Sequence, residues 1–561
     1  MPSFHRSNRA AVAGGVFTFI LLRLRAVAAV AQLHRISKPS RNVLFLVADD
    51  LRPSLGAYGV DLGHTPNIDK LAEEGLTFTR AYTNYAFCAP SRNSFMSGRL
   101  PDTTRVWNFI DHFREEGVGD KWQSLPQFFK ERGYHTAVAG KVYHVDQPPN
   151  SDYPLSWSVE PYNAAAATDD QDKEHDCVGE TSKTVCAIDL SANESNVEKQ
   201  LPDMRIREAC IRALRDASEQ ASPFFIGCGF IRPHTPWIVP REFFERLPES
   251  LPEPQVKAFP KETPREAFSN HGALDGLLYG LRRTYQGDLT NLYRRAYHAA
   301  VSYVDDNVGR VLDALEELGH KDDTIVVLTS DHGYSLGEMS MWTKMTNFEN
   351  ALRVPLIARV PWMENSVGKQ TKVLAELVDL YPTLTALAGL PTPRSQGEMI
   401  NGTSLWSVFM NPANISVKKS ALAQFAKPSL RNPNQVREAL PRNEIELMGY
   451  TLRENRWRYT AWFEWDKHHE VPLHNKVVAR ELYDHHGDCP SCFDFEGDAH
   501  NLAEDPEMKA TVRLMHRWLL NRIRVIPVEN ATEAPVTIRG PRRVRNRQTL
   551  SRKARTSRRA L

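Results

Sequence analysis

The sequence predicts an α/β fold: a large, mostly parallel β-sheet flanked by helices, with a smaller α+β subdomain at its C-terminal end. Two observations support the first part. Between residues 41 and 410, apolar runs alternate with segments of helical periodicity, and several of these runs are apolar almost throughout, as in strands buried on both faces. After residue 411 the pattern changes to alternating strands and one last helix, so we assign residues 411–525 to the subdomain.

The first 31 residues predict a signal peptide. Two arginines precede an apolar run at residues 10–22, and the small residues A-V-A-A-V-A follow at 26–31. The run is short for a membrane span, but Arg23 and Arg25 interrupt the pattern, so an uncleaved anchor remains an alternative. We expect a secreted or lysosomal protein, and four N-x-S/T sequons agree with this route: Asn193, Asn401, Asn414 and Asn530.

The net charge of +2 conceals an uneven distribution. Residues 536–561 contain ten Lys or Arg and no acidic residue, so the remainder has 60 basic against 68 acidic residues and a charge of −8. This balance gives no support to a nucleic-acid-binding core. The composition predicts a disordered basic tail at 534–561. It is either a solvated end or a tether to polyanionic glycans or the cell surface.

The catalytic region, residues 41–410, begins with an apolar strand at 41–48 that ends in Asp49-Asp50. Further strands are expected at 135–139, 223–230, 324–329 and 354–360, and helices at 67–75, 124–132, 204–217, 289–318 and 374–387. Residues 147–196 are polar and irregular, and the proline-rich residues 247–281 are typical of a surface insertion. In the subdomain, strands at 448–453 and 456–463 precede a helix at 506–522.

Four predicted strands end in residues that bind metals or anions. Because ligands gather beyond the carboxyl ends of parallel strands, these residues are expected to meet in one site. A single such end is often an ordinary polar loop, but four together are hard to assign to chance. They are Asp49-Asp50, Lys141 with His144, His234, and Asp331-His332.

The most specific motif is F-C-A-P-S-R-N-S-F-M-S-G-R-L at residues 87–100. Pro90 suits the first turn of a helix, which places Cys88 at a helix N-terminus, where free N–H groups favour anions. The motif resembles the signature of the sulfatase family, in the alkaline phosphatase superfamily, whose cysteine is oxidised to formylglycine. The resemblance covers about residues 42–519 and includes V-A-D-D-L-R-P-S-L-G, G-K-V-Y-H, T-S-D-H-G and V-P-L-I, which begin at residues 47, 140, 329 and 354.

The resemblance implies a role for each candidate residue. Asp49, Asp50, Asp331 and His332 would bind one Ca²⁺ with the formylglycine made from Cys88. Arg92 and Lys141 would hold that formylglycine, and His144 would act on its second hydroxyl. His234 and Lys344 would contact the sulfate. The implied partners are a sulfated polysaccharide substrate and a formylglycine-generating enzyme during maturation; no membrane span is expected apart from the N-terminal anchor considered above.

The chain departs from the family pattern near the expected substrate site. Relatives usually have L-G-E-H before W-x-K, whereas this chain has Met339 at the place of the histidine, and Met341 also lies close to Lys344. The stretch at 411–446 also aligns poorly.

Two alternative functions remain. A phosphatase or phosphodiesterase of the superfamily would carry a Ser or Thr nucleophile, and a non-catalytic glycan-binding relative would lose Cys88 or Asp331.

Seven cysteines are too few for a disulfide scaffold. Cys177 and Cys186 flank a polar loop that a bridge could span. Cys489 and Cys492 form a C-x-x-C, which is either a small bridge or two thiols. Cys210 and Cys228 lie in apolar segments, which predicts buried thiols.

Overall fold

The structure is a computed structural model that describes residues 41–60, 62–163, 185–188, 201–269, 287–433, 435–486 and 496–524. The predicted signal peptide, the basic tail, Cys177, Cys489 and Cys492 lie outside these residues, as do the sequons at Asn193 and Asn530. No helix of the described residues is long and apolar enough to cross a membrane.

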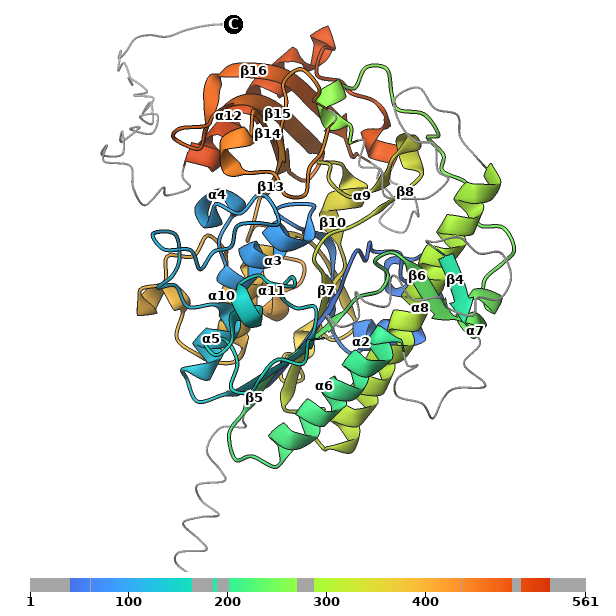
Figure 1. Ribbon diagram of the computed structural model, residues 1–561, viewed down its shortest axis with the longest axis vertical. Coiled ribbons are helices and arrows are strands. Elements are labelled where there is room, and N and C mark those ends of the chain that lie inside the picture. The colour runs from blue at the N-terminus through green and yellow to red at the C-terminus, as the bar shows by residue number, and fades with distance from the viewer. Residues whose placement is uncertain are drawn as a thin grey trace, which may run out of the picture. The chain divides into compact units, whose positions relative to one another are not determined.

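A central sheet carries the site, with the strand order β10-β2-β11-β7-β1-β5-β3 and with β12 paired to β2 (Figure 1). Strands β7, β1, β5 and β3 are neighbours and run parallel, whereas β11 is antiparallel to both β2 and β7. The sheet is therefore mixed, with a parallel half. The strands are β1 (Asn42–Ala48), β2 (Leu76–Tyr82), β3 (His135–Gly140), β5 (Phe224–Phe230), β7 (Thr324–Ser330), β10 (Arg353–Val354), β11 (Leu356–Arg359) and β12 (Lys369–Glu376).

Helices cover both faces of this sheet, which explains the unbroken apolar run of β1. Alternate side chains of a strand point to opposite faces. Leu44 and Leu46 pack with α2, α6 and α8 on one face, and Val43 and Phe45 pack with α3, α5 and α10 on the other. The helices are α2 (Pro66–Glu73), α3 (Cys88–Ser97), α4 (Pro101–Thr104), α5 (Leu125–Lys130), α6 (Pro202–Ser218), α7 (Arg241–Glu245), α8 (Gly287–Glu317), α9 (Glu349–Leu352), α10 (Leu380–Leu387) and α11 (Trp406–Met410).

The C-terminal residues form a second sheet, as predicted. It is antiparallel, with the order β13-β14-β15-β16, and contains β13 (Ala421–Lys427), β14 (Leu447–Arg453), β15 (Trp457–Asp466) and β16 (Val471–Asp484). Helix α12 (Lys509–Arg524) packs on β14 and β15 through Met515, Leu519 and Ile523, which are spaced four residues apart on one face. The boundary at residue 411 remains a prediction.

Two short strand pairs complete the described part of the fold. Strands β4 (Val185–Ile188) and β6 (Trp237–Pro240) pair in parallel, and β8 (Ser335–Leu336) pairs with β9 (Trp342–Thr343). The β8–β9 hairpin leads directly to Lys344. It therefore fixes one of the predicted sulfate ligands.

The helix predicted at 374–387 is wrong at its beginning. Residues 374–376 end strand β12, and α10 starts only at Leu380. β12 begins with exposed polar residues and ends in an apolar run that continues into the helix. The sequence pattern of the strand end therefore cannot be distinguished from that of the helix. Strand β2 gave no signal because threonines and an arginine interrupt it; Thr79 donates a hydrogen bond to the Thr371 carbonyl, 2.9 Å away.

Two further predictions are corrected. Cys210 of α6 and Cys228 of β5 are joined by a disulfide rather than being free thiols; both lie in apolar surroundings, which hid their pairing. Cys186 is also disulfide-bonded, and Cys88 is free and buried. The segment predicted as a surface insertion is partly core, since Leu247, Leu251 and Phe268 are buried. Residues 270–286 lie outside the described part.

Candidate active site

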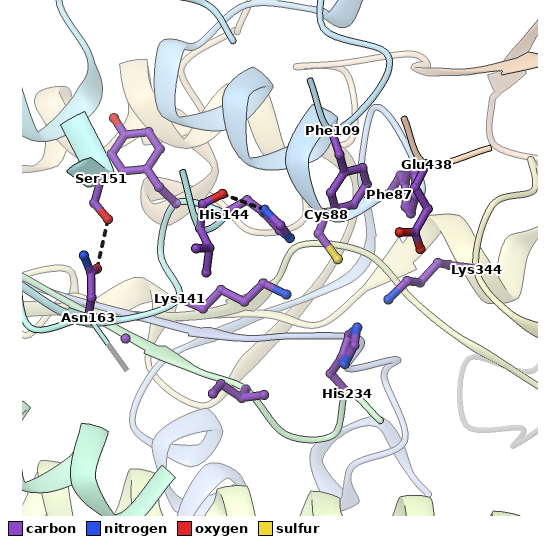
Figure 2. Close-up of a pocket in the computed structure, with 14 residues that line it drawn as sticks. Phe87, Cys88, Phe109, Lys141, His144, Ser151, Asn163, His234, Lys344 and Glu438 are labelled. Carbon is purple, nitrogen blue, oxygen red and sulfur yellow. Dashed lines mark hydrogen bonds between the residues drawn. The ribbon is translucent and has the colours of Figure 1, made fainter. Parts of the chain in front are cut away.

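The four predicted strand ends meet at one edge of the parallel half of the sheet. Asp49 and Asp50 follow β1, Lys141 follows β3, His234 follows β5 by four residues, and Asp331 follows β7. The side chains of Lys141, His234 and Lys344 converge on Cys88 in Figure 2. The structure therefore brings these predicted residues together at one place.

Cys88 is the first residue of α3, as its motif predicts. Phe87 before it is extended, Pro90 lies in the first turn, and all ten residues of the helix are buried. The Cys88 Sγ lies 3.4 Å from Asp49 Oδ1 and 3.2 Å from His332 Nε2. Burial and the neighbouring Asp49 raise the pKa of the unmodified thiol well above its usual value.

The carboxylates around Cys88 are each matched by a cation. Arg92 Nε lies 3.0 Å from Asp331 Oδ2, and its Nη2 lies 3.4 Å from Asp49 Oδ1. Lys141 donates to the other Asp49 oxygen. Burial alone would raise the Asp49 pKa, but Lys141 and Arg92 outweigh it and hold this pKa well below its usual value. Asp49 is therefore ionised, as a metal ligand must be.

Asp50 has a different environment from its neighbour. Both of its oxygens accept hydrogen bonds from Lys344 Nζ, at 2.7 and 3.0 Å. Burial raises its pKa to about 7, against the opposing effect of Lys344. Asp50 thus links the strand end to the residue predicted to contact sulfate.

Four of the five predicted metal ligands form a compact set. One ligand atom each from Asp49, Cys88, Asp331 and His332 lies within 4.8 Å of the others, and all four residues are buried. Ligands on opposite sides of a Ca²⁺ ion lie about 4.6–5.2 Å apart, so the spacing suits a single ion. The Cys88 Sγ occupies the place that the oxygens of a formylglycine would take. Asp50 is outside this set of four.

His144 is held as a neutral imidazole with one free nitrogen. Its Nδ1 donates to the Val145 carbonyl at 3.0 Å, and its ring stands edge-on to Phe109 with centroids 4.6 Å apart. Burial and the nearby Lys141 lower its pKa to about 3. Because Nδ1 carries the proton, Nε2 has a lone pair that can accept one.

Two glycines, Gly140 and Gly229, permit the backbone path that positions Lys141. Gly140 has a φ of +76°, which favours glycine, and a Cβ at Gly229 of β5 would lie 2.2 Å from the Lys141 carbonyl carbon. The backbone after β3 therefore crosses β5 at a distance that only glycine permits. This crossing brings Lys141 and His144 over the site.

A cavity of about 380 Å³ opens onto Cys88. It is lined by the predicted residues Cys88, Lys141, His144, His234 and Lys344 and by residues that the sequence did not single out. The latter include Phe109 and Glu438, of which Glu438 comes from the poorly aligned stretch at 411–446. That poor alignment was the only signal in the sequence that could have pointed to Glu438.

Met339 and Met341 do not line this cavity, which corrects the prediction that they alter the pocket near Lys344. Both are buried in a cluster with Phe268, Phe348 and other apolar residues. The Met339 N–H donates to the Val256 carbonyl at 2.6 Å. The two methionines therefore fasten the 247–269 segment to the Lys344 hairpin.

A buried ion pair fixes the hairpin that carries Lys344. Arg52 Nη1 lies 2.7 Å from Glu338 Oε1, and Glu338 Oε2 accepts the Leu336 N–H at 2.6 Å. Lys344 itself stands between two residues with positive φ, Thr343 at 70° and Met345 at 75°. Such conformations persist only where the surroundings impose them.

Replacing Glu338 with alanine is expected to destabilise the protein by about 3–5 kcal/mol, because the buried Arg52 guanidinium would lose its carboxylate partner at 2.7 Å. Turnover of the Glu338→Ala variant should also fall, since Lys344 would lose its fixed position. Chemical denaturation measures the first effect. Glu364→Ala, an exposed change on the same chain, is the control; equal stability of the two variants would contradict this role for Glu338.

Comparisons with known proteins agree with this site. The sulfatase family model matches residues 41–390. Mouse iduronate 2-sulfatase is 34% identical over 503 residues, covering 79% of this chain and 88% of that protein.

Two solved structures share the fold. One is a protein in complex with its substrate D-glucosamine-2-N,6-O-disulfate, with a TM-score of 0.63, 21% identity, and coverage of 86% of this chain and 98% of the other. The other is a phosphonate monoester hydrolase of Agrobacterium radiobacter, with a TM-score of 0.64, 21% identity, and coverage of 86% and 95%. At such identity these two support the fold alone. The family match and the iduronate 2-sulfatase identity go further: this chain belongs to the sulfatase family and is a sulfuric ester hydrolase.

Proposed function

We propose that this enzyme removes sulfate from a sulfated, uronic-acid-containing glycan, such as a glycosaminoglycan, through a formylglycine made from Cys88. A 2-sulfated iduronate or similar residue at the chain end is the best single candidate. One observation carries the proposal. Cys88 lies at a helix N-terminus between a set of metal ligands and a cavity lined by Lys141, His234 and Lys344.

The cavity is suited to an anionic ester. Two ammonium groups and two imidazoles line the cavity beside Cys88, and fixed cations stabilise negative charge on a bound sulfate and on the transition state. Lys344 is oriented by Asp50, and Lys141 by Asp49. These residues would hold the sulfate with its sulfur facing residue 88.

The hydrated formylglycine would supply two hydroxyl groups. One would attack sulfur while the S–O bond to the glycan breaks and the glycan leaves as its alcohol, and deprotonation of the second would expel the sulfate and restore the aldehyde. The protein residues around it have matching roles. Arg92 and Lys141 would orient the group through their charges, and His144 Nε2 would accept the proton of the second hydroxyl. A plain thiol at residue 88 offers no such route for release.

We assign the metal site to one Ca²⁺ ion held by Asp49, Asp331 and His332 together with the modified residue 88, with Asp50 close by. Two ionised carboxylates suit a hard cation, although an imidazole is a less usual Ca²⁺ ligand. The ion would neutralise the charge of the sulfate oxygens. It would add to the effect of Lys141 and Lys344.

The iduronate 2-sulfatase likeness supports a glycan substrate, since it extends over most of both proteins. A cavity of about 380 Å³ accommodates a small ligand or one end of a longer chain rather than an internal segment. Cleavage at a chain end follows from this shape. The same likeness supports maturation in the secretory pathway, a formylglycine-generating enzyme as partner, and a secreted or lysosomal location.

The substrate assignment is tested by offering the formylglycine-bearing enzyme heparin and dermatan disaccharides with a terminal 2-sulfated uronate. Sulfated polysaccharide fragments without uronic acid serve as the comparison. Sulfate release from the uronate disaccharides is expected to be at least tenfold faster. Release only from the fragments without uronic acid would contradict the substrate class while leaving the reaction intact.

A further inference from the structure

A second cavity, remote in sequence from the catalytic residues, lies between helix α12 and strand β16. It has a volume of about 560 Å³. The face of α12 that lines it carries Lys509, Arg513, Arg517 and Arg524, and β16 adds Arg480. We call this feature the α12 groove.

These five cations share a property within the described part of the chain: none of them has an ion-pair partner. Other basic residues nearby do have one. Arg522 of the same helix lies 2.9 Å from Glu376, and Arg456 lies 2.6 Å from Asp484. Glu504 and Asp505 also line the groove, and Asp505 accepts the Glu507 N–H at 2.8 Å. With five cations against these two carboxylates, the α12 groove has a surplus of positive charge.

The floor of the groove combines apolar and polar groups. Val512 and Leu520 line it, and His516 Nδ1 lies 3.0 Å from the Tyr459 hydroxyl. Burial lowers the pKa of His516, and the charge of Arg480 lowers it further. The contribution of Arg480 shows that the electrostatic potential at His516 is positive, because a nearby positive charge disfavours protonation of the imidazole.

We propose that the α12 groove binds the sulfated polysaccharide away from its reacting end. Arginine presents paired N–H donors that match the oxygens of sulfate and carboxylate groups. Residues 509 to 524 extend along about 22 Å of helix, which is longer than a single sugar and suits several anionic units. The identity of the polymer rests on the proposed glycan substrate, whereas binding itself does not require turnover.

The test uses the full-length protein and a fluorescent heparin octasaccharide. The groove variant is Lys509→Ser/Arg513→Ser/Arg517→Ser. A matched control, Arg241→Ser/Arg246→Ser/Arg310→Ser, removes the same charge from exposed positions on α7, directly after it, and on α8. The groove variant is expected to bind about eightfold more weakly than the control, as the product of roughly twofold losses at each of the three cations.

Hydrolysis of a small aryl sulfate should be equal in all three proteins, which shows that the groove variant is folded and that the catalytic site is unaffected. Equal octasaccharide binding by the two variants would overturn the proposal. So would a groove variant that loses binding to phosphatidylserine vesicles but not to heparin. Failure of the parent enzyme to release glycan sulfate would refute the proposed substrate separately, because octasaccharide binding is measured without turnover.

Discussion

Replacing Cys88 with alanine is expected to reduce sulfatase turnover to less than about a thousandth of the parental rate. Alanine cannot be converted to formylglycine, so the variant has no nucleophile and no second hydroxyl to release sulfate. Because Cys88 is buried and small, the loss of its sulfur should change the melting temperature by only a few degrees. Aryl sulfate hydrolysis and thermal unfolding measure the two effects.

The matched control is Met96→Leu on the same helix, a volume-conserving change in the core behind the site. This variant should retain most of the activity. A purified Cys88→Ala enzyme that kept a tenth of the parental rate would show that the nucleophile is another group.

Replacing Asp331 with asparagine is expected to remove the bound metal and to lower turnover by about a hundredfold or more. Asparagine keeps the shape and can still accept hydrogen bonds, but it lacks the charge that a hard divalent cation requires. Alanine would be a poorer test, because Arg92 would lose its partner at 3.0 Å and the fold would be weakened. Elemental analysis of the purified variant measures the metal.

Asp305→Asn is the control for this experiment. Asp305 is also buried, but it accepts the Ile68 N–H at 2.8 Å, in contact with helix α2 and away from the four metal ligands. It should keep full metal content. Full occupancy in Asp331→Asn as well would contradict the ligand assignment. Treating the parent enzyme with a chelator should abolish activity, and added Ca²⁺ should restore it.

The sequence was sufficient to predict the parallel half of the sheet and the convergence of its strand ends. Strands β1, β5 and β7 are buried on both faces, so their apolar runs are unbroken and their polar ends stand out. The N-terminal position of Cys88 in α3 followed from Pro90. These features are local, and local patterns of residue type determine them.

Features that depend on contacts between distant segments could not be predicted in the same way. The Cys210–Cys228 bridge joins a helix to a strand, and an apolar pattern around each cysteine does not reveal the pairing. Met339 departs from the family pattern at a position expected near the substrate, but its side chain lies in the core, because the 247–269 segment covers it. Glu438 reaches the cavity only through the path of a long irregular segment.

The most direct test of the mechanism is the mass of the peptide that contains Cys88, taken from enzyme with measured activity. Conversion of the thiol side chain to an aldehyde makes the peptide lighter by about 18 Da. The formylglycine mechanism predicts that the fraction of peptide with the lower mass rises in proportion to specific activity across preparations. Fully active enzyme in which this peptide has its unmodified mass would contradict the mechanism.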